Sequence, residues 1–282
     1  MKFRKAGLAA ASVLTLALTV SACGDGGKKD SGSGGTDGGG KDSIKIGIKY
    51  DQPGIGQKTP DGFAGFDVDV ATFVAKELGY DEKNIEFVET PSADREQALS
   101  RGDVEFIAAS YSINDEREKL VDFAGPYLLA HQDLLVAADS DIAKGTDLNG
   151  KNLCSVTGST SAQNVKKTIA PKANLKELST YSECIEGLAS GSIDALTTDD
   201  SILAGYASQP ANKGKFKLAG LKLSNENYGI GVKEGNTELK DKINKALEKM
   251  VADGAWDEAV KKNFGPANYK NEPAPKIGNI VK

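Results

Sequence analysis

Charged and hydroxyl side chains that could bind a small ionic molecule recur along this sequence. Arg117 carries a guanidinium group, which offers two parallel donors that match the two oxygens of a carboxylate. Ser159 and Thr160 lie in a loop that opens a predicted helix, where backbone N–H groups add further donors. Ser110 and Ser112 follow a predicted strand, and their oxygens can accept from an ammonium group. These residue types suit a small molecule that carries both a carboxylate and an ammonium group.

The elements that must position these side chains alternate between strand and helix from Ser43 onward. Residues 44–48 alternate apolar and polar side chains with the period of two that is typical of a strand. The elements predicted for this first unit are the strand 44–48, the helix 67–78, the strand 85–88, the helix 94–101 and the strand 104–109. This order predicts a parallel sheet covered by helices.

A second unit with the same rhythm begins near residue 136. Its predicted elements are the strand 152–156, the helix 162–169, the strand 175–178, the helix 182–189 and the strand 194–197. Two similar α/β units in one chain, with a cleft between them, are a natural place for a ligand.

The last predicted elements follow residue 225. They are a strand at 228–232, a helix at 237–252 and a short helix that carries Trp256 and Val260. One face of the helix 237–252 is apolar and is expected to pack into the core: Ile243, Ala246, Leu247, Met250 and Val251.

The first 22 residues predict a secretory signal peptide. Lys2, Arg4 and Lys5 form a basic start, and the uncharged run 6–20 is largely apolar but too short for a comfortable membrane-spanning helix. Removing this signal takes away three basic residues, so the formal net charge falls from −5 to −8. An acidic body gives no indication of a nucleic-acid partner, which would require a basic face.

The end of the signal, Val20-Ser21-Ala22-Cys23, resembles the lipobox of bacterial lipoproteins. The resemblance implies that Cys23 is diacylated and becomes the new N-terminus; the alternative is an ordinary cleaved signal beside a coincidental cysteine. Residues 23–43 would then be the lipidated cysteine and a flexible tether, because 24–42 are almost entirely Gly, Ser, Asp, Lys and Thr. We expect the protein to be lipid-anchored at the outer face of the cell membrane.

Cys154 and Cys184 remain once Cys23 is assigned to lipid. In an oxidising compartment such a pair predicts a disulfide, and the alternative is two free thiols. Their spacing does not suit a metal cluster. No metal and no cofactor are expected.

The order of the elements and several motifs resemble the family 3 solute-binding proteins of polar amino acid ABC importers. The motifs that carry the resemblance are Gly65-Phe66-Asp67-Val68-Asp69-Val70, Ala93-Asp94-Arg95, Ser112-Ile113-Asn114-Asp115-Glu116-Arg117, Val121-Asp122-Phe123, Gly158-Ser159-Thr160, Asp194-Ala195-Leu196-Thr197-Thr198-Asp199 and Tyr228-Gly229-Ile230. The resemblance implies an α/β fold of the periplasmic-binding-protein type II, a Venus flytrap of two lobes joined by two hinge strands.

The same resemblance implies how the chain is divided. Lobe 1 would hold residues 44–135 and 223–270, with lobe 2 at 136–222 and a C-terminal tail at 271–282. The hinges would lie near residues 134–138 and 221–225, where a few residues absorb the rotation between lobes.

Roles for individual residues also follow from the resemblance. Arg117 matches the arginine of the family that binds the ligand carboxylate, and Asp199 matches the residue that binds the ammonium group. Arg95 matches an arginine that reaches the distal carboxylate in glutamate and aspartate binders, with Ser92 as a helper hydroxyl. Further side-chain candidates are the phenol of Tyr181 and, as a second cation, Lys58. Tyr50 or Tyr111 is a candidate for an aromatic wall.

The sequence therefore predicts an amino-acid-binding lipoprotein that captures glutamate and delivers it to an ABC permease. Alternatives are a glutamine, aspartate or broader polar amino acid binder, or a cyclic-carboxylate dehydratase on the same fold. Binding is favoured over catalysis because the single histidine, His131, lies outside the ligand motifs. No Walker loop is present, so the permease and ATPase subunits are expected on separate chains, and the protein is expected to be a monomer.

Overall fold

The computed structural model describes residues 42–282, which belong to one compact unit. The predicted signal peptide 1–22, the lipidated Cys23 and nearly all of the tether lie outside the described residues. Within 42–282, no helix is long and apolar enough to cross a bilayer.

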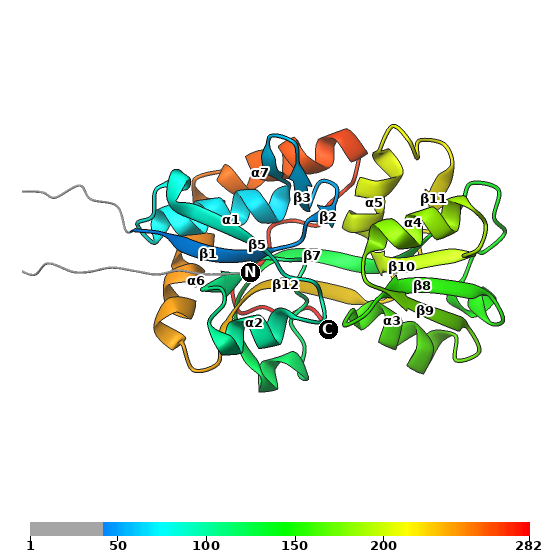
Figure 1. Cartoon of the computed structure of the whole chain (residues 1–282), viewed down its shortest axis with the longest axis horizontal. Helices are drawn as coiled ribbons and strands as arrows, with labels where there is room; N and C mark the ends of the chain where they lie inside the picture. Colours follow the sequence, from blue (N-terminus) through cyan, green and yellow to red (C-terminus); the bar gives the residue numbers. More distant parts are fainter. Residues whose placement is uncertain (1–41) are drawn as a thin grey trace, which may run out of the picture. The chain divides into compact units, whose positions relative to one another are not determined.

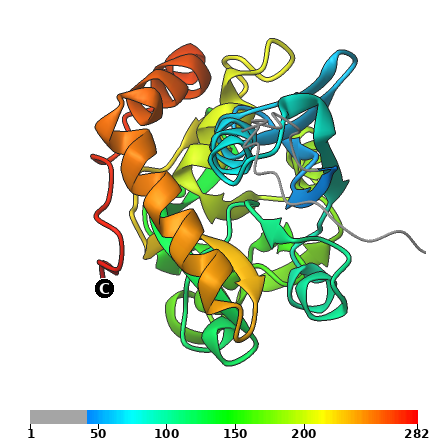
Figure 2. The same ribbon diagram turned by 90° about the vertical axis from the view of Figure 1, so that its left-hand side faces the viewer.

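Lobe 1 is built on the parallel strands β1 (Ile44–Ile48), β5 (Ile85–Glu89) and β6 (Phe106–Ile107), with β1 in the middle. A small antiparallel sheet of β2 (Asp51–Gln52), β3 (Gly56–Thr59) and β4 (Gly62–Ala64) follows β1. The helices of this lobe are α1 (Phe66–Glu77), α2 (Arg95–Arg101), α6 (Thr237–Ala252) and α7 (Ala255–Phe264), with short turns at Glu82–Asn84, Arg117–Lys119 and Gly265–Ala267. Figure 2 shows this lobe end-on, with α6 nearest the viewer and α7 above it.

Lobe 2 repeats the arrangement with β8 (Asn152–Val156) between β9 (Asn174–Leu178) and β10 (Ala195–Asp199), all parallel. Its helices are α3 (Thr160–Asn164) with the continuing turn Val165–Ile169, α4 (Tyr181–Ala189) and α5 (Asp200–Ser208), besides a turn at Gly145–Leu148. The short strand β11 (Phe216–Leu218) adds to the sheet. The predicted βαβαβ order of both units is thus confirmed.

Two long antiparallel strands, β7 (Val121–Ala137) and β12 (Asn225–Lys233), join the lobes (Figure 1). The first part of β7 pairs with β12 up to His131, and from Gln132 onward β7 pairs with β10 of lobe 2. The change of pairing partner at residues 131–132 lies close to the predicted hinge at 134–138. The exact lobe boundaries stay a prediction, since the described residues 42–282 belong to one unit.

Most of the predicted apolar face of α6 lies in the core. Ile243, Ala246, Leu247 and Met250 are buried, whereas Val251 is 42% exposed. Including Val251 in the core face was wrong, because at 3.6 residues per turn it points roughly 90° away from the centre of that face. Trp256 of α7 is buried as predicted and donates from Nε1 to the Tyr127 carbonyl at 2.8 Å.

A disulfide and the C-terminal tail provide two further connections between elements of the fold. A disulfide links Cys154 of β8 to Cys184 of α4, which confirms the predicted pairing. The C-terminal tail runs beside β12, where Asn227 and Val281 exchange hydrogen bonds of 2.9 and 3.0 Å. The tail also reaches His131 through Glu272, at 3.0 Å.

Candidate ligand-binding cleft

A small cavity lies between the lobes, and polar side chains from both lobes line it. Every residue predicted to bind the ligand lines this cavity, with the exception of Lys58. The lining residues are Gln52, Ser92, Arg95, Ser110, Ser112, Arg117, Ser159, Thr160, Tyr181, Asp199 and Ile202. Residues that are far apart in sequence meet here because both lobes direct the carboxyl ends of their parallel strands toward the cleft.

Arg117 is buried at the edge of the cavity, just before β7. One guanidinium nitrogen donates to the Ser112 carbonyl at 2.7 Å, and the other donates across the cleft to the Gly158 carbonyl at 3.1 Å. Its Nε lies 3.6 Å from Glu96 Oε1. Burial, and next the nearby Arg95 charge, lower the pKa of Arg117 to about 10, so that it remains a cation at neutral pH.

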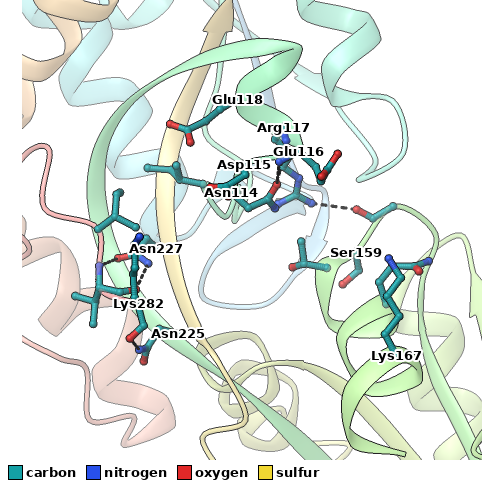
Figure 3. Close-up of a pocket in the computed structure, with 16 residues that line it drawn as sticks. Asn114, Asp115, Glu116, Arg117, Glu118, Ser159, Lys167, Asn225, Asn227 and Lys282 are labelled. Atoms are coloured by element: carbon teal, nitrogen blue, oxygen red, sulfur yellow. Dashed lines mark hydrogen bonds between the residues drawn. The ribbon is translucent and has the colours of Figure 1, made fainter. Parts of the chain in front are cut away.

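A wider groove of about 910 Å³ lies beside the cavity and shares Arg117, Ser159 and Thr160 with it. Figure 3 shows Arg117 and Ser159 approaching this groove from opposite lobes, with Asn225 and Asn227 of β12 on a third side. The shared side chains therefore form the partition between the cavity and the groove.

Hydrogen bonds within the loop and to neighbouring elements hold the loop that carries Ser159 and Thr160 in place. Ser159 Oγ accepts from the Ser161 N–H at 3.2 Å and from the Tyr181 hydroxyl at 3.4 Å. Thr160 Oγ1 donates to Glu226 at 3.4 Å. The disulfide at Cys154 lies on the strand that leads into this loop.

Asp199 ends β10 and is 5% exposed. Its Oδ2 accepts from the Tyr228 hydroxyl at 2.6 Å. Burial, and next the negative charge of Glu226, raise the pKa of Asp199 well above its ordinary value. Glu226 of β12 is itself 6% exposed and was missed by the sequence analysis. Because these two neighbouring carboxyl groups are almost entirely buried, this end of the cleft is suited to a cation.

Arg95 begins α2 and is 2% exposed. One of its terminal nitrogens donates to the Ala109 carbonyl at 2.9 Å, but its Nε has no hydrogen-bond partner among residues 42–282. None of the ion pairs in that range includes Arg95. A buried guanidinium without a carboxylate partner makes this end of the cavity suited to an anion.

Tyr111 supports both arginines. The guanidinium carbons of Arg95 and Arg117 lie 4.1 and 5.0 Å from the centre of its ring. Its hydroxyl donates to Glu96 at 2.7 Å. Tyr111 thus supplies an aromatic platform, whereas Tyr50 is half-buried and donates to the Phe87 carbonyl.

Ser110 is held in a strained backbone conformation, with a φ of 47°. Its N–H donates to Asp67 Oδ2 at 2.7 Å, and its hydroxyl donates to Gln52 at 2.6 Å. Tyr127 donates to the other Asp67 oxygen at 2.7 Å. Burial raises the pKa of Asp67 to about 6. Asp67 had been noted only as part of a motif, and the structure makes it the residue that positions Ser110.

The second cation near Arg95 is Lys49 rather than Lys58. Lys58 is exposed on β3, with its Nζ 5.4 Å from the Tyr50 ring, and it does not reach the cavity. Lys49 directly follows β1, is 3% exposed and contacts Ser92 Oγ at 3.3 Å. The signal that could have found Lys49 is its place at the carboxyl end of a predicted parallel strand.

Two α/β lobes, two connecting strands and a charged cleft between them define a two-lobed ligand-binding protein of the type II arrangement. The sequence profile of the bacterial extracellular solute-binding proteins, family 3, matches residues 44–266, and the chain belongs to this family.

Relatives and solved structures agree with this assignment. The chain is 44% identical over 275 residues to the glutamate-binding protein GluB of Corynebacterium efficiens, covering 93% of this chain and 92% of that one. It is 41% identical to the glutamine-binding protein GlnH of Bacillus subtilis, over 78% and 81% of the two chains. A solved structure of an ancestral arginine-binding protein bound to glutamine superimposes with a TM-score of 0.74 at 38% identity, covering 80% of this chain and 99% of that one.

Proposed function

We propose that this protein binds free glutamate between its lobes and delivers it to an ABC importer. The observation that carries the proposal is that buried groups of opposite charge line one cavity. The guanidinium groups of Arg95 and Arg117 and the carboxyl group of Asp199 are all buried there, and Glu226 acts electrostatically on Asp199. An amino acid has both charges on one carbon, and this arrangement offers each of them a partner.

In the proposed complex, Arg117 binds the α-carboxylate and Asp199 binds the α-ammonium group. Burial, and next the repulsion from Glu226, raise the pKa of Asp199, and the ammonium group would relieve that repulsion. Arg117 and Ser159 come from opposite lobes, so the ligand links the lobes and favours the closed form.

Glutamate is favoured over glutamine because of Arg95. This buried guanidinium group has no carboxylate partner in the described part of the chain, and a ligand side chain ending in a carboxylate would supply one. A neutral amide would leave the charge unbalanced. The name of the relative from Corynebacterium efficiens supports the same ligand.

Calorimetric titration of the purified protein with glutamate, glutamine, aspartate and arginine tests the proposal. We expect the tightest binding for glutamate. Tighter binding of glutamine would support the alternative suggested by the name of the relative from Bacillus subtilis. Equal binding of several polar amino acids would support a broader binder, and turnover of prephenate or arogenate would support a dehydratase. Absence of binding to every amino acid tested would refute the assignment.

We also propose that Cys23 carries a lipid anchor at the outer face of the cell membrane, and that the protein acts as a monomer. The permease and ATPase subunits would be separate chains. The support is the lipobox-like sequence before Cys23 and the family assignment. Labelling cells with an alkyne fatty acid should mark the wild-type protein but not Cys23→Ser, which should be released from the membrane.

A further inference from the structure

We propose that residues 268–282, which we call the strap, stabilise the closed arrangement of the two lobes and slow the release of a bound ligand. The strap follows the turn Gly265–Ala267 and includes the C-terminal tail. The match to the family profile stops at residue 266, so the profile does not cover the strap. The inference goes beyond the proposed function, because it gives a conformational role to a segment that does not line the ligand cavity.

The two lobes contact each other in this structure, which is therefore a closed form. Asp51 of β2 in lobe 1 accepts from two residues of lobe 2. Its Oδ2 accepts from the Tyr181 N–H, at the start of α4, at 2.9 Å, and its carbonyl accepts from the Tyr206 hydroxyl of α5. Arg117 donates across the cleft to the Gly158 carbonyl. The contacts of the strap described next are thus contacts of the closed form.

The start of the strap is bonded to lobe 2. The Tyr269 hydroxyl donates at 2.8 Å to Asp200 Oδ1, at the start of α5, and the same oxygen accepts from the His131 N–H at 3.0 Å. Glu272 Oε1 accepts from Lys222 Nζ at 2.9 Å and lies 3.0 Å from His131 Nε2. Hydrogen bonds from Lys222, and next from His131, hold the pKa of Glu272 below its ordinary value, so the ion pair with Lys222 is present at neutral pH.

The end of the strap is bonded to the two connecting strands. The Gly278 N–H donates at 2.9 Å to the Gly125 carbonyl of β7. Val281 exchanges hydrogen bonds of 2.9 and 3.0 Å with the Asn227 side chain of β12. Residues 280–282 also line the groove beside the ligand cavity (Figure 3). The strap therefore passes from α5 of lobe 2 to the part of β7 and β12 where these strands pair with each other.

A segment that is bonded at both ends resists separation of the lobes. Opening turns one lobe relative to the other about the strands that connect them. Only a short stretch of chain separates Glu272 from Gly278, so this rotation must break the bonds at one end of the strap. Interactions made only in the closed form shift the equilibrium toward that form. A ligand enclosed between the lobes leaves after they separate, and the strap therefore slows its release.

The first experiment combines Tyr269→Phe with Glu272→Gln, which removes one donor and one charge while keeping the shapes of both side chains. Stopped-flow measurements with glutamate should show dissociation about five- to tenfold faster than in the wild type and association changed by less than about twofold. Lys276→Gln is the matched control, because it removes a charge from an exposed strap residue, and it should change neither rate.

Exchange of the paired charges separates the strap bonds from a general loss of fold. Glu272→Lys places two cations together and should speed glutamate dissociation, and adding Lys222→Glu should restore most of the wild-type rate. Slower association with unchanged dissociation in the first double variant would reduce the strap to a supporting segment and overturn the proposal. The single variant Glu272→Gln decides the question where the double variant fails to fold.

The second experiment needs no ligand. Small-angle X-ray scattering of the unliganded wild type and of Tyr269→Phe with Glu272→Gln should show that the variant is less compact. Identical scattering together with identical glutamate dissociation would overturn the proposal. Absence of glutamate binding to the wild type would instead refute the proposed function, and the scattering comparison would then decide on the strap by itself.

Discussion

Arg95 and Arg117 are both buried guanidinium groups, but their charges are balanced differently. Arg117 has Glu96 at 3.6 Å, together with two backbone carbonyls. Arg95 has carbonyl oxygens as hydrogen-bond acceptors and forms no ion pair within 4.0 Å among residues 42–282. The difference matters because a buried cation without an ion-pair partner is costly unless a ligand supplies the anion. At the scale of single residues, Arg95 is therefore the residue to which the proposed function assigns the choice of ligand.

Arg95→Gln should consequently weaken glutamate binding by on the order of 100-fold and glutamine binding by only a few-fold, since glutamine brings no second carboxylate. Calorimetric titration of both ligands against the variant measures this difference. Equal losses for the two ligands would show that Arg95 supports the cavity without reading the ligand side chain.

Asp67 leads to a prediction about stability. Its pKa is raised to about 6 in the folded protein from an ordinary value of 3.8, because it is buried. The folded state therefore binds a proton more tightly than the unfolded state, and charged Asp67 destabilises the fold above pH 6. As the pH falls from 7 to 4, this residue should add about 2.4 kcal/mol to the free energy of unfolding.

Asp67→Asn removes that titration while keeping the shape of the side chain. Denaturant unfolding of both proteins at pH 4, 5, 6 and 7 measures the gain, because other groups that titrate in both proteins largely cancel in the difference. We expect the wild type to gain stability relative to the variant as the pH falls. A constant difference over this range would contradict the prediction.

At the scale of elements, the disulfide joins β8 to α4 and closes a loop with a sequence separation of 30. Its position at the base of the loop that carries Ser159 and Thr160 links the stability of lobe 2 to the geometry of the site. The bond restricts the unfolded chain more than the folded one.

Replacing Cys154 and Cys184 together by Ala should lower the free energy of unfolding by about 3 to 4 kcal/mol. Denaturant unfolding of the oxidised wild type, the reduced wild type and the double variant gives the measurement. The reduced wild type should behave like the double variant. Equal stability of all three samples would mean that the bond does not constrain the unfolded state.

At the scale of the whole molecule, closure brings backbone from the two lobes into direct contact. Gly205 of α5 faces the Pro53 carbonyl, which lies in the loop between β2 and β3, and a Cβ atom at Gly205 would clash with that oxygen. Gly158 faces Ser92 and Ala93 in the same way, with a Cβ atom 2.7 Å from Ala93 Cα. Small residues at these points let the lobes approach closely.

Gly205→Ala should therefore weaken glutamate binding by at least about tenfold without harming the lobes themselves, because Ala is favourable within a helix. Ser208→Ala on the same helix is the control and should bind normally. Small-angle X-ray scattering at saturating glutamate should show that the variant is less compact than the wild type. Unchanged affinity and compactness would show that the contact adjusts at little cost.

Apart from Val251, the wrong or missing assignments share one cause, which is that they concern partners far apart in sequence. Lys58 is predicted as a second cation from its residue type alone, whereas the buried Lys49 donates to Ser92, 43 positions away in sequence. Glu226 acts through Asp199, and Asp67 acts through Ser110.

Local patterns, in contrast, were sufficient for most of the architecture. The strand 44–48 and the helix 237–252 appear in the structure with the predicted bounds, because apolar residues recur along each element with the period of that element. The order of these elements implied two α/β units, and the motifs named Arg95, Arg117 and Asp199. Which charges are left without a partner in the cleft was beyond the reach of the sequence, since the energy of a buried charge depends on every group that the fold places around it.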